Sequence, residues 1–251
     1  MSLRKRVLAG ETVRGAMAFE CLVPALPQLL VLAGAEFVLY DMEHSGASVE
    51  TIKAQAAFCR GLPIVPMVRP PQGEYRYIAR LLDSGAKGIM APMIESAEEA
   101  AALVEACRYP PEGRRGAGFG FAHDDYVGGP FGPKMAKANE EILVIAQIET
   151  ERGVAHVDAI ASTEGIDVIW IGQADLSNFL GVSGDFESAA FREAWAEIRA
   201  AARRHGKALG VLAMNPEMMA GYAAEGHEML AAGTDQAILM EGYRRIIAAA
   251  G

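Results

Sequence analysis

The sequence has few cysteines, a deficit of basic residues and no long apolar run. Its three cysteines, Cys21, Cys59 and Cys107, are odd in number and far apart, which argues against a disulfide framework or a zinc site. We expect them to be buried free thiols in a reducing compartment. Lysine and arginine total 23 against 32 aspartates and glutamates, for a net charge of −9. This balance disfavours a protein that binds nucleic acid or a membrane surface through clustered cations.

Targeting and membrane segments are also missing. No apolar run reaches the roughly 18 residues of a membrane span. The first residues, MSLRKRVLAGETVRG, lack the apolar stretch and small-residue cleavage site of a signal peptide. We therefore expect a cytoplasmic protein that does not bind membranes.

What the sequence does have is a regular alternation of apolar runs and helical patterns. Hydrophobic residues make up 51% of the 251 residues, enough for a large core. Short apolar runs of this kind are typical of parallel strands that are buried on both faces. The predicted strands are Arg14–Glu20, Phe37–Asp41, Ile64–Val68, Gly88–Pro92, Leu143–Ile148, Val168–Ile171, Ala208–Ala213 and Glu228–Ala232.

Eight such strands with intervening helices predict an α/β fold, a (β/α)8 TIM barrel, with residues 1–251 as a single domain. A doubly wound open sheet is the alternative, but no GxGxxG motif follows the first strand to support it. The rhythm breaks once, between about residues 110 and 140, in a stretch rich in glycine and proline. We interpret this stretch as a functional loop and expect its segment 116–132 to cover the barrel mouth.

Polar residues at the ends of several predicted strands indicate where the chemistry lies, because barrel enzymes place their sites at the carboxyl ends of the strands. These residues are Asp41, Glu43, His44, Arg69, Gln147, Glu149 and Asp175. Glu149 and Asp175 follow neighbouring strands, and two carboxylates suit a hard divalent cation such as Mg²⁺ or Mn²⁺. The alternative is that both merely cap the helices that follow.

Arg69 and His44 can each be interpreted as a catalytic residue or as a structural one. Arg69 precedes two prolines, and a rigidly held guanidinium could stabilise a developing oxyanion; alternatively it forms a salt bridge with a strand-end carboxylate. His44 could transfer a proton near neutral pH or be structural. His123, in the long loop, could contact a substrate or simply pack.

In these residues and their order, the chain resembles the HpcH/HpaI aldolases, a family of metal-dependent pyruvate aldolases. The resemblance extends from about residue 14 to the carboxyl terminus. The stretches that carry it are DMEHS (41–45), MVRP (67–70), LLDSGAKGIMAPMIESAEEA (81–100), RYPPEGRRGAG (108–118), QIET (147–150) and IGQADLS (171–177).

The resemblance implies a class II aldolase, a carbon–carbon lyase. Such an enzyme reversibly cleaves a 4-hydroxy-2-keto acid to pyruvate and an aldehyde through a metal-bound pyruvate enolate. It implies a divalent cation, Mg²⁺, Mn²⁺ or Co²⁺, as cofactor. It also implies a homo-oligomer, a hexamer built as a trimer of dimers or else a trimer, with the last helix exchanged between subunits.

The resemblance assigns a role to each matching position. Glu149 and Asp175 match metal ligands, and Arg69 matches the residue that stabilises the enolate. His44 matches the catalytic base, and Asp83 the carboxylate that pairs with it, although the pattern alone predicts a surface residue at a helix end. The remaining substrate-binding positions are matched by Gln147 and, through its backbone N–H, Ala174; Asp175 is also expected to contact substrate.

The chain departs from the family pattern in places that concern the aldehyde. Gln173 stands where the family usually has proline, and the 116–132 loop has no arginine. Glu20, at the end of the first predicted strand, adds a negative charge at the mouth. These differences disfavour an aldehyde that carries a carboxylate. Two other functions stay open, an acyl-CoA lyase of the citrate-lyase-β type and a non-catalytic barrel that binds keto acids.

Overall fold

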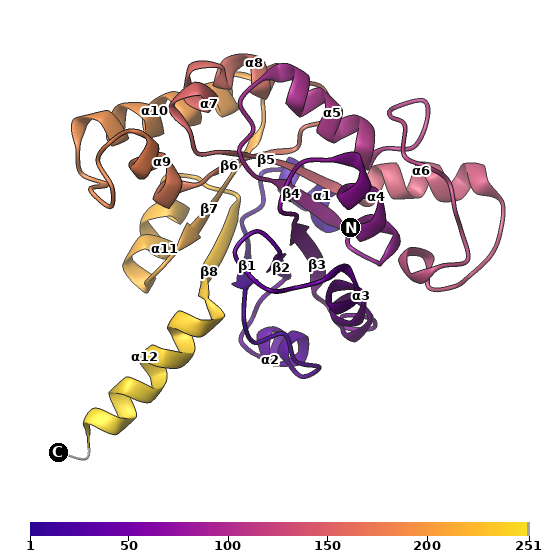
Figure 1. Cartoon of the computed structure of the whole chain (residues 1–251), viewed down its shortest axis with the longest axis horizontal. Helices are drawn as coiled ribbons and strands as arrows, with labels where there is room; N and C mark the ends of the chain where they lie inside the picture. The colour runs from indigo at the N-terminus through magenta and orange to yellow at the C-terminus, as the bar shows by residue number, and fades with distance from the viewer. Residues whose placement is uncertain (250–251) are drawn as a thin grey trace.

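Eight parallel strands form a closed ring with the helices outside it (Figure 1). This computed structural model describes residues 1–249. Each strand pairs with the next, and β8 pairs with β1, so the predicted (β/α)8 barrel is confirmed. That residues 1–251 form a single domain stays a prediction. The strands are β1 (Val13–Ala18), β2 (Phe37–Asp41), β3 (Val65–Arg69), β4 (Gly88–Ala91), β5 (Leu143–Ile148), β6 (Val168–Ile171), β7 (Ala208–Ala213) and β8 (Met229–Thr234).

The predicted strands match the observed ones closely. The bounds agree for β2, β5, β6 and β7, and β3, β4 and β8 are shifted by one or two residues. The first predicted strand, Arg14–Glu20, extended too far, because β1 ends at Ala18. The next residues leave the sheet, since the backbone N–H groups of Phe19, Glu20 and Cys21 donate to the Asp235 carboxylate at 3.0, 3.0 and 2.6 Å.

Helices occupy the connections between the strands. They are α1 (Leu3–Leu8), α2 (Leu26–Leu32), α3 (Val49–Phe58), α4 (Tyr75–Asp83), α5 (Ala97–Cys107), η1 (Ala122–Asp124), α6 (Phe131–Glu141), α7 (Glu151–Ala155), α8 (Val157–Ser162), α9 (Gln173–Phe179), α10 (Ala189–Arg204), α11 (Pro216–Ala224) and α12 (Asp235–Ala248). Serine caps begin several of them; Ser96 Oγ accepts the N–H of Glu99 at the start of α5. Such caps satisfy donors that the first helical turn leaves free.

Side-chain alternation divides the apolar residues between two cores. Successive residues of a strand point to opposite faces, so Phe37 and Leu39 lie inside the barrel with Met67 and Ile145. The intervening residues, such as Tyr40, pack against the helices. Two cysteines lie in this outer core: burial raises the pKa of Cys59 to about 11 and that of Cys107 to about 12. The third, Cys21, is only half-buried, contrary to the prediction.

The amino-terminal end of the barrel is closed by α1 and a buried ion-pair network. Leu3 and Val7 of α1 belong to the inner core. Asp167, just before β6, accepts from Arg4 of α1 and from Arg108 after α5, at 2.8 and 3.1 Å. This network leaves the opposite, carboxyl end of the barrel as the open mouth.

The last helix, α12, points away from the barrel (Figure 1). None of its described side chains is buried, and Ile246 and Ile247 are 73% and 70% exposed. Its first residue, Asp235, joins the helix to the segment after β1. No helix within residues 1–249 has the length and apolarity that a membrane crossing requires; the cytoplasmic location stays a prediction.

Candidate active site at the carboxyl ends of the strands

The alternation that fills the barrel with apolar side chains also brings polar ones together at its mouth. Beyond Phe37 and Leu39, the next inward position of β2 is Asp41. Applied to β3 and β5, the same period of two places Arg69 and Gln147 on the inward face, near the carboxyl ends of their strands. In the β2–β3 register Asp41 lies directly opposite Arg69. A ring of polar groups therefore follows from the strand pattern itself.

Arg69 is held firmly by two carboxylates. It is 6% exposed. Its Nε donates to Asp41 Oδ1 at 2.5 Å, and its Nη1 lies 3.1 Å from Glu43 Oε2. The ring of Phe19 lies against its guanidinium, 5.9 Å from the ring centroid to Cζ. The salt bridge that the sequence offered as the alternative is thus present, and it leaves the rest of the guanidinium fork in a fixed orientation toward the mouth.

Asp41 also shapes the turn that carries His44. The Asp41 carboxylate accepts the backbone N–H groups of Glu43 and His44, at 3.4 and 2.8 Å. The imidazole of His44 is about half exposed, with Nε2 3.7 Å from Glu43 Oε2. A histidine in this position is free to approach a ligand at the mouth. Asp41 and Glu43 had been noted as strand-end acids, but no role was predicted for either; the period of two in β2 is the signal that groups them with Arg69.

Glu149 is a buried carboxylate that has no cationic partner among residues 1–249. It is 1% exposed and accepts hydrogen bonds from the Met93 backbone N–H, at 2.7 Å, and from the Gln147 side-chain amide. Met93 has a φ of 55°, a left-handed conformation that is rare outside glycine and concentrates at functional sites. A Cβ at Gly172 would collide with both Glu149 and Gln147, so only glycine fits there.

Burial and neighbouring negative charge both act on this group of acids. Burial raises the pKa of Glu149 to about 7, with smaller contributions from Glu43 and Asp175 that the two hydrogen bonds oppose. Burial likewise raises the pKa of Glu43, against the lowering effect of Arg69 and His44. Buried carboxylates with raised pKa values are frequent at functional sites.

The donor set suits a hard divalent cation. Within residues 1–249, no three or more His, Cys, Asp and Glu side chains are grouped closely enough to hold a metal. The negative charge of Asp175 contributes to the raised pKa of Glu149, and two carboxylates with further ligands from water or substrate are a common arrangement for Mg²⁺. A cation between them would compensate the buried charge of Glu149.

The segment after β6 presents the other predicted positions. Asp175 is half-buried, and Ala174 precedes it in the first turn of α9, where backbone N–H groups have no helical acceptor. Gln173, at the position where proline was expected, is buried; its amide donates to Leu212 O at 3.0 Å, and its carbonyl accepts from Tyr222 at 3.4 Å. Gln173 therefore ties α9 to β7 and α11.

Asp83 lies apart from the rest of the predicted site. It is the last residue of α4, and helices of this barrel end at the amino-terminal side of the next strand. Its carboxylate pairs with Arg115 at 2.6 Å, and its side chain is 42% exposed. His44 follows the carboxyl end of β2. The chain by itself therefore does not bring Asp83 to His44.

The prediction that the 116–132 loop covers the mouth of its own barrel is wrong. Ala122 O accepts from Arg60, after α3, and His123 O accepts from Lys87, just before β4, both at 2.9 Å. These partners belong to the amino-terminal end of the barrel. Phe119 of the loop packs there against Tyr109 and His123, whereas Phe121 and Tyr126 are exposed. His123 is buried in this packing and does not reach the site.

Comparison with known proteins identifies the family. Residues 21–241 match the family described as HpcH/HpaI aldolase/citrate lyase. The chain belongs to this family. A hydroxypyruvate/pyruvate aldolase from Roseovarius nubinhibens is 36% identical over 225 residues, covering 90% of this chain and 87% of the relative. A 5-keto-4-deoxy-D-glucarate aldolase from Salmonella arizonae is 35% identical, covering 89% and 86%.

The fold agrees with that of a solved family member. The crystal structure of an HpcH/HpaI aldolase from Desulfitobacterium hafniense has a TM-score of 0.94 with this chain at 30% identity, covering 99% of this chain and 96% of the other. The predicted membership of the HpcH/HpaI family is therefore confirmed, and with it an aldolase-type barrel. The two curated relatives carry the names of different aldolases, so their names alone do not select the aldehyde.

Proposed function

We propose that this HpcH/HpaI protein is a metal-dependent aldolase that reversibly cleaves a 4-hydroxy-2-keto acid to pyruvate and an aldehyde. The observation that carries the proposal is the juxtaposition at one barrel mouth of a clamped guanidinium and an uncompensated buried carboxylate. Arg69 is fixed by Asp41 at 2.5 Å, and Glu149 is buried with a raised pKa. Cleavage of a keto acid needs both features: a cation that binds its oxygens, and a hydrogen-bond donor to the oxygen on which negative charge develops.

Glu149 and Asp175 would hold the divalent cation. When bound, a cation such as Mg²⁺, Mn²⁺ or Co²⁺ supplies Lewis acidity toward the keto acid. The chain's own groups do the rest: the side chain of Gln147 and the N–H of Ala174 orient the pyruvate half of the substrate. Arg69 donates to the oxygen that becomes negative in the pyruvate enolate, and its position is set by Asp41 before substrate arrives.

His44 is the proposed base. It removes the proton from the C4 hydroxyl, the C3–C4 bond breaks, and the electron pair moves toward the 2-keto oxygen beside Arg69. Protonation of the enolate at C3 then completes pyruvate. A Schiff-base route would need a lysine at the mouth, whereas Lys87 lies before β4, at the other end of the barrel. This placement supports the metal-assisted route.

We also propose that the protein is a homo-oligomer, with α12 packed against another copy. The support is the exposed apolar surface of α12, which includes Ile238, Leu239, Met240, Tyr243, Ile246 and Ile247. Contiguous apolar patches on this scale mark interaction surfaces. Assembly also bears on the predicted His44–Asp83 pair: because the two residues lie at opposite ends of one barrel, Asp83 could reach His44 only from a neighbouring subunit.

The function is tested by pyruvate release from a panel of 4-hydroxy-2-keto acids, followed with lactate dehydrogenase and NADH. We expect turnover that disappears after extended dialysis against EDTA and returns with Mg²⁺, Mn²⁺ or Co²⁺. Full activity in excess EDTA would refute the metal dependence. Turnover only of an acyl-CoA thioester would favour the lyase alternative, and saturable keto acid binding without any product would favour a binding protein. Sedimentation velocity, comparing wild type with Ile246→Glu, tests assembly.

A further inference from the structure

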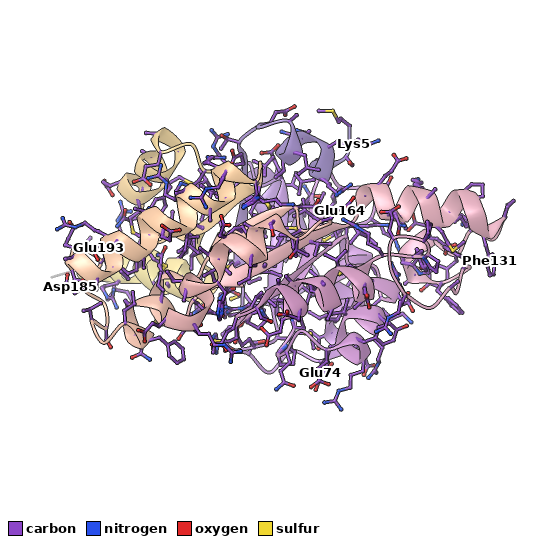
Figure 2. All side chains as sticks on the ribbon, turned by 90° about the horizontal axis from the view of Figure 1, so that it is seen from above. Lys5, Glu74, Phe131, Glu164, Asp185 and Glu193 are labelled. Atoms are coloured by element: carbon purple, nitrogen blue, oxygen red, sulfur yellow. The ribbon has the colours of Figure 1, made fainter. Side chains whose placement is uncertain are left out.

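A second cavity lies at the end of the barrel opposite the proposed active site. Its volume is about 370 Å³, within the size range of small-molecule sites. Lys87 and Ile142, which directly precede β4 and β5, line its floor, and Phe119 and His123 of the 116–132 loop line its roof. The cavity is lined by residues of α4 and α6. In Figure 1, α6 lies on the other side of the molecule from α12, and Figure 2 shows Phe131 at the outer tip of α6.

Two buried side chains that line the cavity have polar atoms without hydrogen-bond partners among the described residues. Arg115 is 2% exposed; its Nη2 donates to Asp83, but its Nε has no acceptor. His123 is 9% exposed, and neither of its ring nitrogens has a partner. Buried polar atoms are nearly always paired, so these atoms, on two residues that line one cavity, indicate a missing acceptor group.

The charges around the cavity leave one cation in excess. The neighbouring carboxylates are already paired: Asp124 with Lys134 at 2.7 Å, Asp125 with Arg60 at 2.9 Å and Glu141 with Lys137 at 3.8 Å. The ammonium group of Lys87 donates only to the carbonyl of His123, at 2.9 Å. Among residues 1–249 it forms no ion pair with a carboxylate. Burial lowers the pKa of Lys87, as expected for an ammonium group without a counter-ion.

The remaining walls are apolar and aromatic. The ring of Phe119 lies at a tilt to that of His123, with 5.5 Å between ring centroids, and Leu82 and Ile142 complete the surface. An inorganic anion would leave this apolar surface unused, whereas an organic anion would cover it.

We propose that this cavity binds a small organic anion, a carboxylate or phosphate monoester with an apolar or aromatic body. The anionic group would accept from Lys87 Nζ, Arg115 Nε and a ring N–H of His123. The body would pack against Phe119 and Ile142. Asp83 accepts from Nη2 of the same guanidinium at 2.6 Å, which leaves Nε for the anion.

Isothermal titration calorimetry on the full chain tests the site, with benzoate and phenyl phosphate as organic probes and inorganic phosphate as a probe of the head group alone. We expect saturable binding of at least one organic probe. Lys87→Gln should weaken it by about tenfold or more, because a charge-assisted hydrogen bond is lost. Lys207→Gln is the matched control: Lys207 is also half-buried and precedes a strand, β7, but donates to Thr163 O and Ile166 O away from the cavity.

A second variant tests the site independently, in case Lys87→Gln does not fold. His123→Phe keeps an aromatic ring in the roof while removing both nitrogens, and its fold is checked by thermal melting beside wild type. It should also weaken the organic probe, and the ¹⁵N resonances of His123 in labelled wild-type protein should shift on titration. The proposal is overturned if no organic probe saturates, if both variants bind it as wild type does, or if inorganic phosphate binds as tightly as phenyl phosphate.

Discussion

Two buried carboxylates at opposite ends of the barrel have opposite environments. Asp167, at the amino-terminal end, is 2% exposed and accepts from Arg4, Arg108 and the backbone N–H of Val144. Glu149, at the mouth, is as deeply buried but has only neutral donors. A buried acid whose charge the protein itself compensates serves the fold. One whose charge is left uncompensated is available for a ligand, and this contrast separates scaffold from site.

The largest effect should come from Glu149→Gln. The amide keeps the shape of the side chain but cannot bind a cation in the same way, so we expect Mn²⁺ binding and pyruvate release to fall below detection. Mn²⁺ binding is measured by electron paramagnetic resonance and activity by the coupled assay. Retention of Mn²⁺ affinity within about twofold of wild type would mean that Glu149 is not a ligand.

Asp167→Asn should give the reverse result. It leaves Arg4 and Arg108 without their shared counter-charge, and breaking a buried pair typically costs about 3–5 kcal/mol of the free energy of unfolding. Urea denaturation measures this loss. In the fraction that remains folded, Mn²⁺ affinity should match that of wild type. A variant that lost Mn²⁺ binding without losing stability would erase the distinction between the two carboxylates.

Arg69→Lys tests the guanidinium that Asp41 holds. Lysine keeps the charge but loses the planar fork, so kcat should fall by about 10²-fold or more while KM changes much less. Steady-state kinetics with a fixed aldehyde gives both constants. An unchanged kcat would remove Arg69 from the stabilisation of the enolate.

The smallest predicted effect is a pH dependence of stability in the metal-free protein. The pKa of Glu149 is raised to about 7, so between its ordinary value and 7 the native state holds a proton that the unfolded state has released. Stability should therefore decrease as pH rises through this window, by up to about 1.4 kcal/mol per pH unit, and level off above it. Urea midpoints in EDTA measure the slope. Glu149→Gln should flatten it, and an equal slope in that variant would assign the effect to another group.

The sequence predicted the barrel well because each step depends on local pattern. Strand positions follow from short apolar runs, and the inward period of two then turns Asp41, Arg69 and Gln147 toward the barrel axis near the carboxyl ends of their strands. The positions of Asp83 and the 116–132 loop did not follow, because no periodicity specifies which end of a barrel a long connection covers. Met93 has a left-handed backbone conformation that directs its N–H at Glu149. The sequence did not signal this conformation, since it is glycine or asparagine, and not methionine, that usually marks it.

The contacts of Asp235 affect how the loss of activity in a truncated chain should be interpreted. Asp235 is the first residue of α12, and its carboxylate accepts three N–H groups from the segment that follows β1. One of these N–H groups belongs to Phe19, whose ring contacts Arg69. A chain cut before Asp235 would lose an apolar helix and also release the edge of the mouth. Inactivity in such a truncation would therefore not distinguish failed assembly from a disordered rim, whereas a chain that ends a few residues after Gln236 separates the two.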